Sequence, residues 1–383
     1  MKQTPQDSDG PVWSQESHCL ALDGLRGLAI LMVTLYRLCK ELDRTGHPVI
    51  AVVQSASQIG GRGVDLFFVL SGFLITGILI RAKGKPDYFR NFIARRSLRI
   101  FPLYFASLAI GLWVLPSLLG GHAFEKAQSE QAYLWTYTSN IRVSWLNDWC
   151  FGPFDHFWSL AVEEHFYLVW PAIVMLLPVK RLGWFCVFTV AAVAIARALA
   201  DPIASLDVAV DVLTIFRIDA LCLGALLAAL LQSKVHHDQI RRIAPIVAIG
   251  VIAILIFISM FGTRMFGVPA LLVRFFFMAG MAIVLLSPKR SLLPLIFENP
   301  ALRFLGKYSY GMYVVQLPVV TLLPLASLVA YLPSHPILSS ILYVSSIFGL
   351  ITLIAFLSFH LFESHFLRLK TRFDGGGASP PSS

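Results

Sequence analysis

Long apolar runs alternate with short polar connections along almost the whole chain. A helix needs about 20 predominantly apolar residues to cross the hydrocarbon core of a bilayer. Ten segments meet this description, namely residues 24–42, 62–80, 100–119, 157–178, 182–199, 212–231, 243–262, 269–287, 304–330 and 337–362. The pattern therefore predicts an all-α, polytopic membrane bundle of about ten transmembrane helices, of which the first is the least apolar because Arg26 and Arg37 interrupt it.

Basic residues gather in every second connection between these segments. Lys and Arg concentrate in residues 81–99, 180–181, 234–242, 289–307 and 368–372, whereas the other connections hold few or none. Cytoplasmic loops of membrane proteins carry an excess of Lys and Arg. The alternation therefore predicts that the basic side and both termini are cytoplasmic, in a multi-pass protein of the cell (inner) membrane.

Composition narrows the class of protein further. The chain of 383 residues is 57% hydrophobic and 14% charged, whereas soluble domains average about 45–50% apolar and 25% charged residues. This excludes a soluble enzyme, and it excludes a nucleic-acid binder despite the net charge of +9. The five cysteines form no CxxC pair and no metal-ligand spacing, so neither a metal site nor a disulfide framework is expected.

The polar ends of the chain differ from its apolar middle. Residues 1–17 contain Pro and Gly and no apolar run, and residues 371–383 end in a Gly-, Ser- and Pro-rich stretch. We expect a disordered cytoplasmic N-terminus over residues 1–17, a transmembrane domain over residues 18–370 and a disordered tail over residues 371–383. With no soluble domain expected at either end, an extracytoplasmic partner that completes an exported reaction would be a separate chain.

Four arginines lie within or beside the first and third predicted spans. A charged residue within a span costs at least about 2.5 kcal/mol on insertion scales, so each is a functional candidate. Arg26 and Arg37 are three helical turns apart and share a face, and Arg96 and Arg99 have the i, i+3 spacing at the start of the third span. Paired guanidinium groups suit phosphate; the alternative is that these residues anchor the helices at the interface.

A second group of ionisable residues is predicted to lie in the outer half of the bundle. Its members are Asp65, His156, Glu163, Glu164, His165, Arg217 and Asp219. Carboxylates and imidazoles gathered at one depth are typical of general acid–base catalysis. The alternative is that Arg217 and Asp219 neutralise the other charges and serve the structure alone.

Six blocks of sequence indicate the class of protein more specifically than composition does. They are residues 22–27 (LDGLRG), 63–75 (GVDLFFVLSGFLI), 95–104 (RRSLRIFPLY), 158–167 (WSLAVEEHFY), 217–224 (RIDALCLG) and 308–313 (YSYGMY). In this order, over about residues 18–370, the chain closely resembles the acyltransferase 3 family of integral membrane acyltransferases. The resemblance implies transfer of an acyl group, usually acetyl, from cytoplasmic acyl-CoA to a hydroxyl of an envelope or exported glycan.

The resemblance also implies roles for individual residues. Arg26, Arg96 and Arg99 would hold the phosphates of acyl-CoA, which is a donor substrate and not a resident cofactor. Glu163 and Glu164 match the family's VEE segment and join His156, His165 and Arg37 as the catalytic candidates. The candidates for substrate binding are Asp65, Trp158, Tyr167, Arg217 and Asp219. The expected partners are acyl-CoA, a glycan or lipid-linked saccharide and membrane lipid, with no nucleic acid.

One position departs from the family pattern. The family's first-span motif places a histidine, regarded as the catalytic base, eleven positions after the arginine, and here that position is Arg37, which cannot accept a proton at physiological pH. A second frequent histidine is Gln316 here. Three hypotheses follow. In the first, Arg37 stabilises the thioester oxyanion and the base is another group, drawn from His156 or His165 with Glu163 or Glu164. In the second, the chain is a catalytically silent paralogue that binds acyl-CoA or a lipid-linked sugar, and in the third, position 37 is a loss-of-function or engineered change.

A transporter is the alternative from a different class. Charged residues within the spans would suit transport of a small solute, but the sequence shows no inverted repeat and no pair of broken helices in its two halves.

Overall fold

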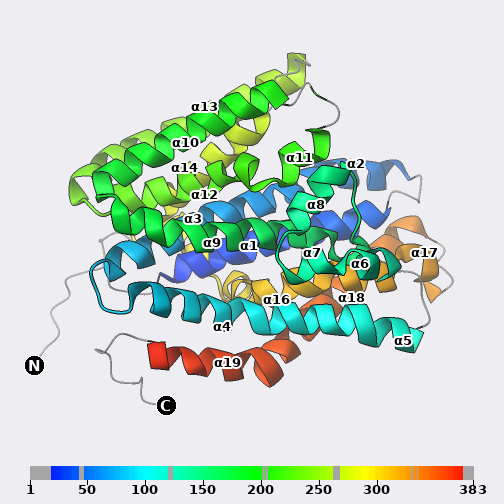
Figure 1. Cartoon of the computed structure of the whole chain (residues 1–383). Coiled ribbons are helices and arrows are strands. Elements are labelled where there is room, and N and C mark those ends of the chain that lie inside the picture. The colour runs from blue at the N-terminus through cyan, green and yellow to red at the C-terminus, as the bar shows by residue number, and fades with distance from the viewer. Residues whose placement is uncertain are drawn as a thin grey trace, which may run out of the picture.

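The computed structural model describes residues 19–42, 47–119, 124–200, 203, 206–261, 268–328, 331–333 and 335–373. Its regular structure is helical. Long helices run side by side through the bundle, and most of the short helices gather at one end of it (Figure 1).

Each predicted span coincides with a long helix. The long helices are α1 (Leu20–Lys40), α3 (Gly63–Ala82), α4 (Tyr88–Ala109), α9 (Trp158–Leu176), α10 (Val179–Ala200), α12 (Thr214–Leu230), α13 (His237–Phe261), α14 (Val268–Leu286), α16 (Pro300–Leu322) and α18 (Pro336–Ser358). Short helical segments connect or extend them. These are α2 (Pro48–Ser57), η2 (Gln58–Arg62), η3 (Ile110–Val114), α5 (Leu115–Leu119), α6 (Glu125–Ser129), α7 (Gln131–Trp135), α8 (Ser139–Leu146), η5 (Gly152–Phe157), α11 (Asp207–Val212), η7 (Lys234–His236), α15 (Leu292–Phe297), α17 (Leu325–Leu328), η9 (Phe359–Glu363), α19 (Ser364–Arg368) and η10 (Leu369–Phe373).

Three boundaries differ from the sequence expectation. Helix α4 begins at Tyr88, well before residue 100, so Arg96 and Arg99 lie inside a helix and not at its start. Helix α16 ends at Leu322 and is followed by the separate short helix α17. Segment η10 continues to Phe373, three residues into the predicted disordered tail, and the Arg90 guanidinium lies 5.9 Å from the Phe373 ring centre. Residues 1–18 and 374–383 lie outside the described residues.

Eight helical segments in the described parts of the chain are long and apolar enough to cross a membrane. They are Pro48–Ala82, Tyr88–Leu118, Gly152–Leu176, Val179–Ala200, Asp207–Leu230, Lys234–Ile258, Val268–Leu286 and Pro336–Phe373. Helices α1 and α16 are not among these segments. The count of ten crossings and the cytoplasmic location of the termini therefore stay predictions.

Glycines bring two pairs of helices into backbone contact. A Cβ atom built on Gly306 of α16 would lie 1.9 Å from the Asp23 carbonyl oxygen of α1. One built on Gly224 of α12 would lie 1.9 Å from the Val69 carbonyl oxygen of α3. Small residues allow membrane helices to approach this closely, and dispersion contacts then hold them together. These two contacts fix the rotation of α1 against α16 and of α3 against α12, and α3 and α16 contribute most to the cavity described next.

Candidate active site

A cavity of about 630 Å³ lies inside the bundle, within the usual range of about 300–1,000 Å³ for small-molecule sites. Its walls come from α1, α3, α4, α9, α12, α16 and the C-terminal segments η9 to η10. It is lined by Val64 in the first turn of α3 and by Arg81 in the last turn. At 1.5 Å per helical residue these positions are about 26 Å apart, so the cavity extends along most of the length of α3.

Positive charge dominates the cavity wall. The basic lining residues are Arg26, Arg81, Arg96, Arg99, Arg303, Lys307 and Lys370, and the acidic ones are Asp23, Glu163 and Glu363. An excess of cations in a low-dielectric interior favours binding of an anion. In the part of the chain that the structure describes, no group of three His, Cys, Asp or Glu side chains is placed to hold a metal ion.

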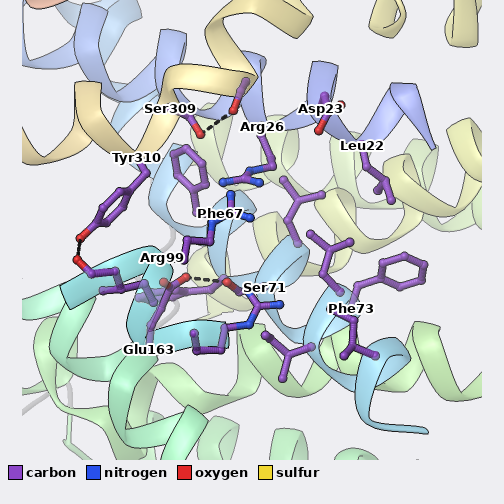
Figure 2. A pocket seen from close by; sticks show the side chains of 18 of the residues that line it. Leu22, Asp23, Arg26, Phe67, Ser71, Phe73, Arg99, Glu163, Ser309 and Tyr310 are labelled. Carbon is purple, nitrogen blue, oxygen red and sulfur yellow. Dashed lines mark hydrogen bonds between the residues drawn. The ribbon is translucent and has the colours of Figure 1, made fainter. Parts of the chain in front are cut away.

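Three of these arginines come together from two helices. Arg96 and Arg99 lie on one side of α4, because residues three apart on a helix are neighbours, and both line the cavity. Arg26 of α1 lines the same cavity, and Figure 2 shows Arg26 and Arg99 there. The Arg96 guanidinium lies 5.8 Å from the Tyr167 ring centre, which is a cation–π contact. The three arginines predicted to hold phosphate thus line one cavity, together with Tyr167, a predicted substrate-binding residue.

A hydrogen-bonded group of hydroxyls and a carboxylate lies at the middle of the cavity. The Ser71 hydroxyl donates to Glu163 Oε1 at 2.7 Å, and the Tyr167 hydroxyl donates to Glu163 Oε2 at 3.1 Å (Figure 2). The Ser71 and Tyr167 hydroxyl oxygens are 3.0 Å apart. Arg26 and Arg96 line the same cavity as Glu163. Sequence reasoning missed Ser71, although a hydroxyl in the middle of an otherwise apolar span was a signal for it.

The end of the cavity away from the Lys and Arg residues is built around Tyr313. The Ser159 and Tyr313 hydroxyls form a hydrogen bond of 2.5 Å with each other, and the His156 carbonyl oxygen lies 3.0 Å from Ser159 Oγ and 3.1 Å from the Tyr313 hydroxyl, so that it accepts from whichever of them does not donate to the other. The His156 imidazole is buried and packs against the Tyr313 ring with a centre separation of 5.2 Å. His156 therefore lies behind the cavity wall and not on it.

Four other candidates are also absent from the cavity lining. The Arg37 guanidinium lies 5.6 Å from the Tyr36 ring centre, and His165 Nδ1 pairs with the Thr214 hydroxyl at 2.7 Å. Trp158 packs against the Arg217 guanidinium at 5.2 Å, and Glu164 follows the cavity-lining Glu163 without lining the cavity itself. Thus Glu163 is the one lining residue among the proposed catalytic groups.

The proposed substrate-binding residues Asp65, Arg217 and Asp219 form a buried ion network instead of lining the cavity. Asp65 Oδ1 accepts from Arg274 Nε at 2.9 Å and from Arg217 Nη2 at 3.0 Å, and Arg274 Nη1 also pairs with Asp219 Oδ2. All four side chains are at most 5% exposed. Two buried guanidinium groups therefore face two buried carboxylates, and Arg62 approaches Asp65 Oδ2 at 3.7 Å from a more exposed position. This pairing corresponds to the structural alternative stated above for Arg217 and Asp219.

Apolar helices around a polar, basic interior define an integral membrane protein. A family model described as an acyltransferase domain, the acyltransferase 3 family, matches residues 20–360. The chain belongs to this family.

Several bacterial proteins are similar to the chain. A Staphylococcus aureus (strain COL) protein provisionally named an O-acetyltransferase, SACOL0978, is 27% identical over 78% of this chain and 50% of its own length. The peptidoglycan O-acetyltransferase OatA of Listeria monocytogenes is 31% identical over 40% of this chain and 24% of its own length. The chain thus spans about half the length, or less, of these curated relatives. A comparison with solved structures found no match.

Proposed function

We propose that this protein is a membrane O-acyltransferase that moves an acyl group, acetyl in the first instance, from acyl-CoA to a hydroxyl of a cell-envelope or exported carbohydrate. Membership of the acyltransferase 3 family supports acyl transfer, and the names of the relatives support acetyl as the group. The observation that carries the proposal is the convergence of Arg26, Arg96 and Arg99 on one cavity.

The donor binds at the basic end of the cavity. Coenzyme A carries phosphate groups, and each guanidinium fork can donate two hydrogen bonds to phosphate oxygens. Arg96 and Arg99 supply two such forks from α4, and Arg26 supplies a third from α1. In the proposed topology this end faces the cytoplasm, where acyl-CoA is made.

The acceptor reaches the cavity from the opposite end, near Val64 and Tyr313. A glycan or a lipid-linked saccharide presents neutral hydroxyls, which match the hydroxyl-lined wall formed by Ser159 and Tyr313. The protein then lies in the cell (inner) membrane with both termini inside, in contact with membrane lipid. A separate extracytoplasmic protein is the proposed partner if the acyl group travels further.

Glu163 is the general base in this proposal. A base must lie within hydrogen-bond reach of the proton that it removes, and Glu163 lines the cavity whereas His156, His165 and Glu164 do not. Arg37, which occupies the position of the family's histidine, is likewise absent from the lining and receives no step. Loss of that histidine is therefore compatible with catalysis by Glu163.

The donor site is tested by neutralising its arginines. Losing two charge-assisted hydrogen bonds of about 1.5–3 kcal/mol each should weaken acetyl-CoA binding at least about 100-fold in Arg96→Ala/Arg99→Ala. The matched control is Arg90→Ala/Arg95→Ala, which removes the same charge from two exposed positions on α4 that do not line the cavity. Equal acetyl-CoA affinity in the two double variants would contradict the donor site.

Catalysis is tested by transfer of labelled acetyl from acetyl-CoA to envelope glycan in membrane vesicles. We expect transfer by the natural chain, with no requirement for Arg37→His. Acetyl-CoA binding without transfer, restored by Arg37→His, would identify a silent paralogue. Solute uptake without a covalent product would identify a transporter.

A further inference from the structure

Ser71 differs from most hydroxyl residues of the helices. Thr34 and Ser358 also donate to side chains, namely Gln316 and Glu363, but unlike Ser71 they do not line the cavity. Serine and threonine within helices commonly donate to a backbone carbonyl one turn earlier. Ser107, Ser159, Ser287, Ser309, Ser340 and Thr352 all do so. The Ser71 hydroxyl instead donates to the Glu163 carboxylate on another helix, at 2.7 Å. A hydroxyl held by a carboxylate in this way is arranged to lose its proton.

We propose that Ser71 is a nucleophile that carries the acyl group between donor and acceptor as a covalent ester. The inference rests on the proposed acyl transfer and adds a step to it: the reaction proceeds in two displacements, and acyl-CoA never meets the glycan.

In the first displacement, Ser71 Oγ attacks the carbonyl carbon of the acyl-CoA thioester while Glu163 takes the hydroxyl proton. The Tyr167 hydroxyl lies 3.0 Å from Ser71 Oγ and donates to Glu163 before the reaction; once Glu163 holds the Ser71 proton, the Tyr167 proton turns from Glu163 to the oxyanion that forms. The C–S bond then breaks, and the departing thiolate of coenzyme A takes the proton from Glu163. The products are acyl-Ser71 and free coenzyme A, with Glu163 again ionised.

In the second displacement, a hydroxyl of the acceptor attacks the ester carbon of acyl-Ser71. Glu163 takes the acceptor's proton and returns it to Ser71 Oγ as the ester bond breaks. The chain is regenerated and the acceptor carries the acyl group, so that atoms and protons balance without a further reactant.

The position of Ser71 in the membrane bundle explains why a relay is useful. Along α3, Ser71 is about 15 Å from Arg81 at the basic end and about 10 Å from Val64 at the other end, at 1.5 Å per residue. Both residues line the same cavity as Ser71. A covalent ester at this midpoint lets coenzyme A leave on one side before the acceptor enters on the other.

Acyl-Ser71 is tested by incubating the purified full-length protein with acetyl-labelled acetyl-CoA and no acceptor. The natural chain should retain label on the peptide that contains Ser71, and the label should survive neutral hydroxylamine and leave in alkaline hydroxylamine, as an oxygen ester does. Ser71→Ala should lose the label completely. Glu163→Gln should slow labelling about 100-fold or more, the usual contribution of a general base.

Two further variants keep the test informative if Ser71→Ala misfolds. Ser71→Cys retains a nucleophile, so its label should become a thioester that neutral hydroxylamine releases. Ser309→Ala is the matched control, because Ser309 also lines the cavity but its hydroxyl donates to the Gly306 carbonyl of its own helix at 2.9 Å. Its labelling should equal that of the natural chain.

The outcomes separate this inference from the proposed function. Acetyl transfer to glycan without label on Ser71, or with label that persists in Ser71→Ala, would overturn the relay and leave the acyltransferase. A label released by neutral hydroxylamine from the natural chain would place the acyl group on a thiol such as the cavity-lining Cys19 and would also overturn it. Failure to bind acetyl-CoA would contradict the proposed function itself.

Discussion

Replacing Arg274 by methionine tests the buried ion network directly. The Arg274 side chain is fully buried and joins Asp65 on α3 to Asp219 on α12. In Arg274→Met, Asp65 keeps its pair with Arg217, whereas Asp219 keeps the hydrogen bond from the Ala220 amide. One buried negative charge is therefore left without a cation.

The size of the effect follows from this imbalance. Breaking a buried ion pair by removing one partner costs about 3–5 kcal/mol, because an uncompensated charge stays in the interior. That is a large share of a typical unfolding free energy of about 5–15 kcal/mol. Adding Asp219→Asn removes the stranded charge, so Arg274→Met/Asp219→Asn should regain about 2–3 kcal/mol, within the usual range of coupling energies.

The unfolding free energy is measured by titration with a denaturing detergent, followed with a thiol-reactive fluorophore. All five cysteines are buried, so the signal reports exposure of the interior. Arg241→Met, at an exposed position of α13, is the control and should change stability by no more than about 0.5 kcal/mol. If Arg274→Met proves as stable as Arg241→Met, or if Asp219→Asn adds its own destabilisation in full, the network does not hold the helices as described.

Two further predictions concern packing and surface charge. Gly306→Ala should destabilise the protein by more than about 2 kcal/mol, because the added Cβ atom meets the backbone of α1. Gly280→Ala on α14 should be neutral or stabilising by up to about 1 kcal/mol, because its added Cβ atom would meet no neighbouring atom within 4 Å. The same detergent titration compares the two variants, and equal stability would refute the α1–α16 contact. Arg142 pairs with Glu130 at 2.7 Å and holds the pKa of Glu130 below its usual range. The pair therefore stabilises the protein above the unfolded pKa of about 4.3 and ceases to do so as the pH falls through the lower folded pKa. The midpoint temperature of thermal unfolding should thus be lower in Arg142→Gln than in the natural chain at pH 7, and the two should not differ at pH 2. An equal difference in midpoint at both pH values would contradict the pairing.

The sequence was sufficient for features that depend on neighbouring residues. Apolar run length located every long helix, and the i, i+3 spacing placed Arg96 and Arg99 in the same cavity, because helical geometry is fixed by local hydrogen bonds. The start of α4 was missed because residues 88–99 are too charged to register as part of a span.

Contacts between distant segments could not be read from the sequence. Arg274 meets Asp65 from 209 positions away, and Ser71 meets Glu163 from 92 positions away. Which side chains face each other depends on how each helix is rotated, and that rotation is set by backbone contacts such as the one at Gly306. The predicted depth in the membrane grouped His156 and His165 with Glu163. The rotation of the helical segments decides which of these side chains lines the cavity, and of the three only Glu163 does.

The seam between α1 and α16 has a consequence for biosynthesis. Helix α1 leaves the ribosome well before α16, because Gly306, the glycine that contacts it, is made roughly 280 residues later, which takes on the order of 15–60 s at usual elongation rates. Until then Arg26 has neither its partner helix nor the remaining wall of the cavity, to which Lys370 also belongs. For most of its synthesis, the nascent chain must therefore keep the charged helix α1 in the insertion machinery or at the membrane surface. A chain cut short before α16 would leave Arg26 of α1 without its partner helix, and membrane quality control could recognise it.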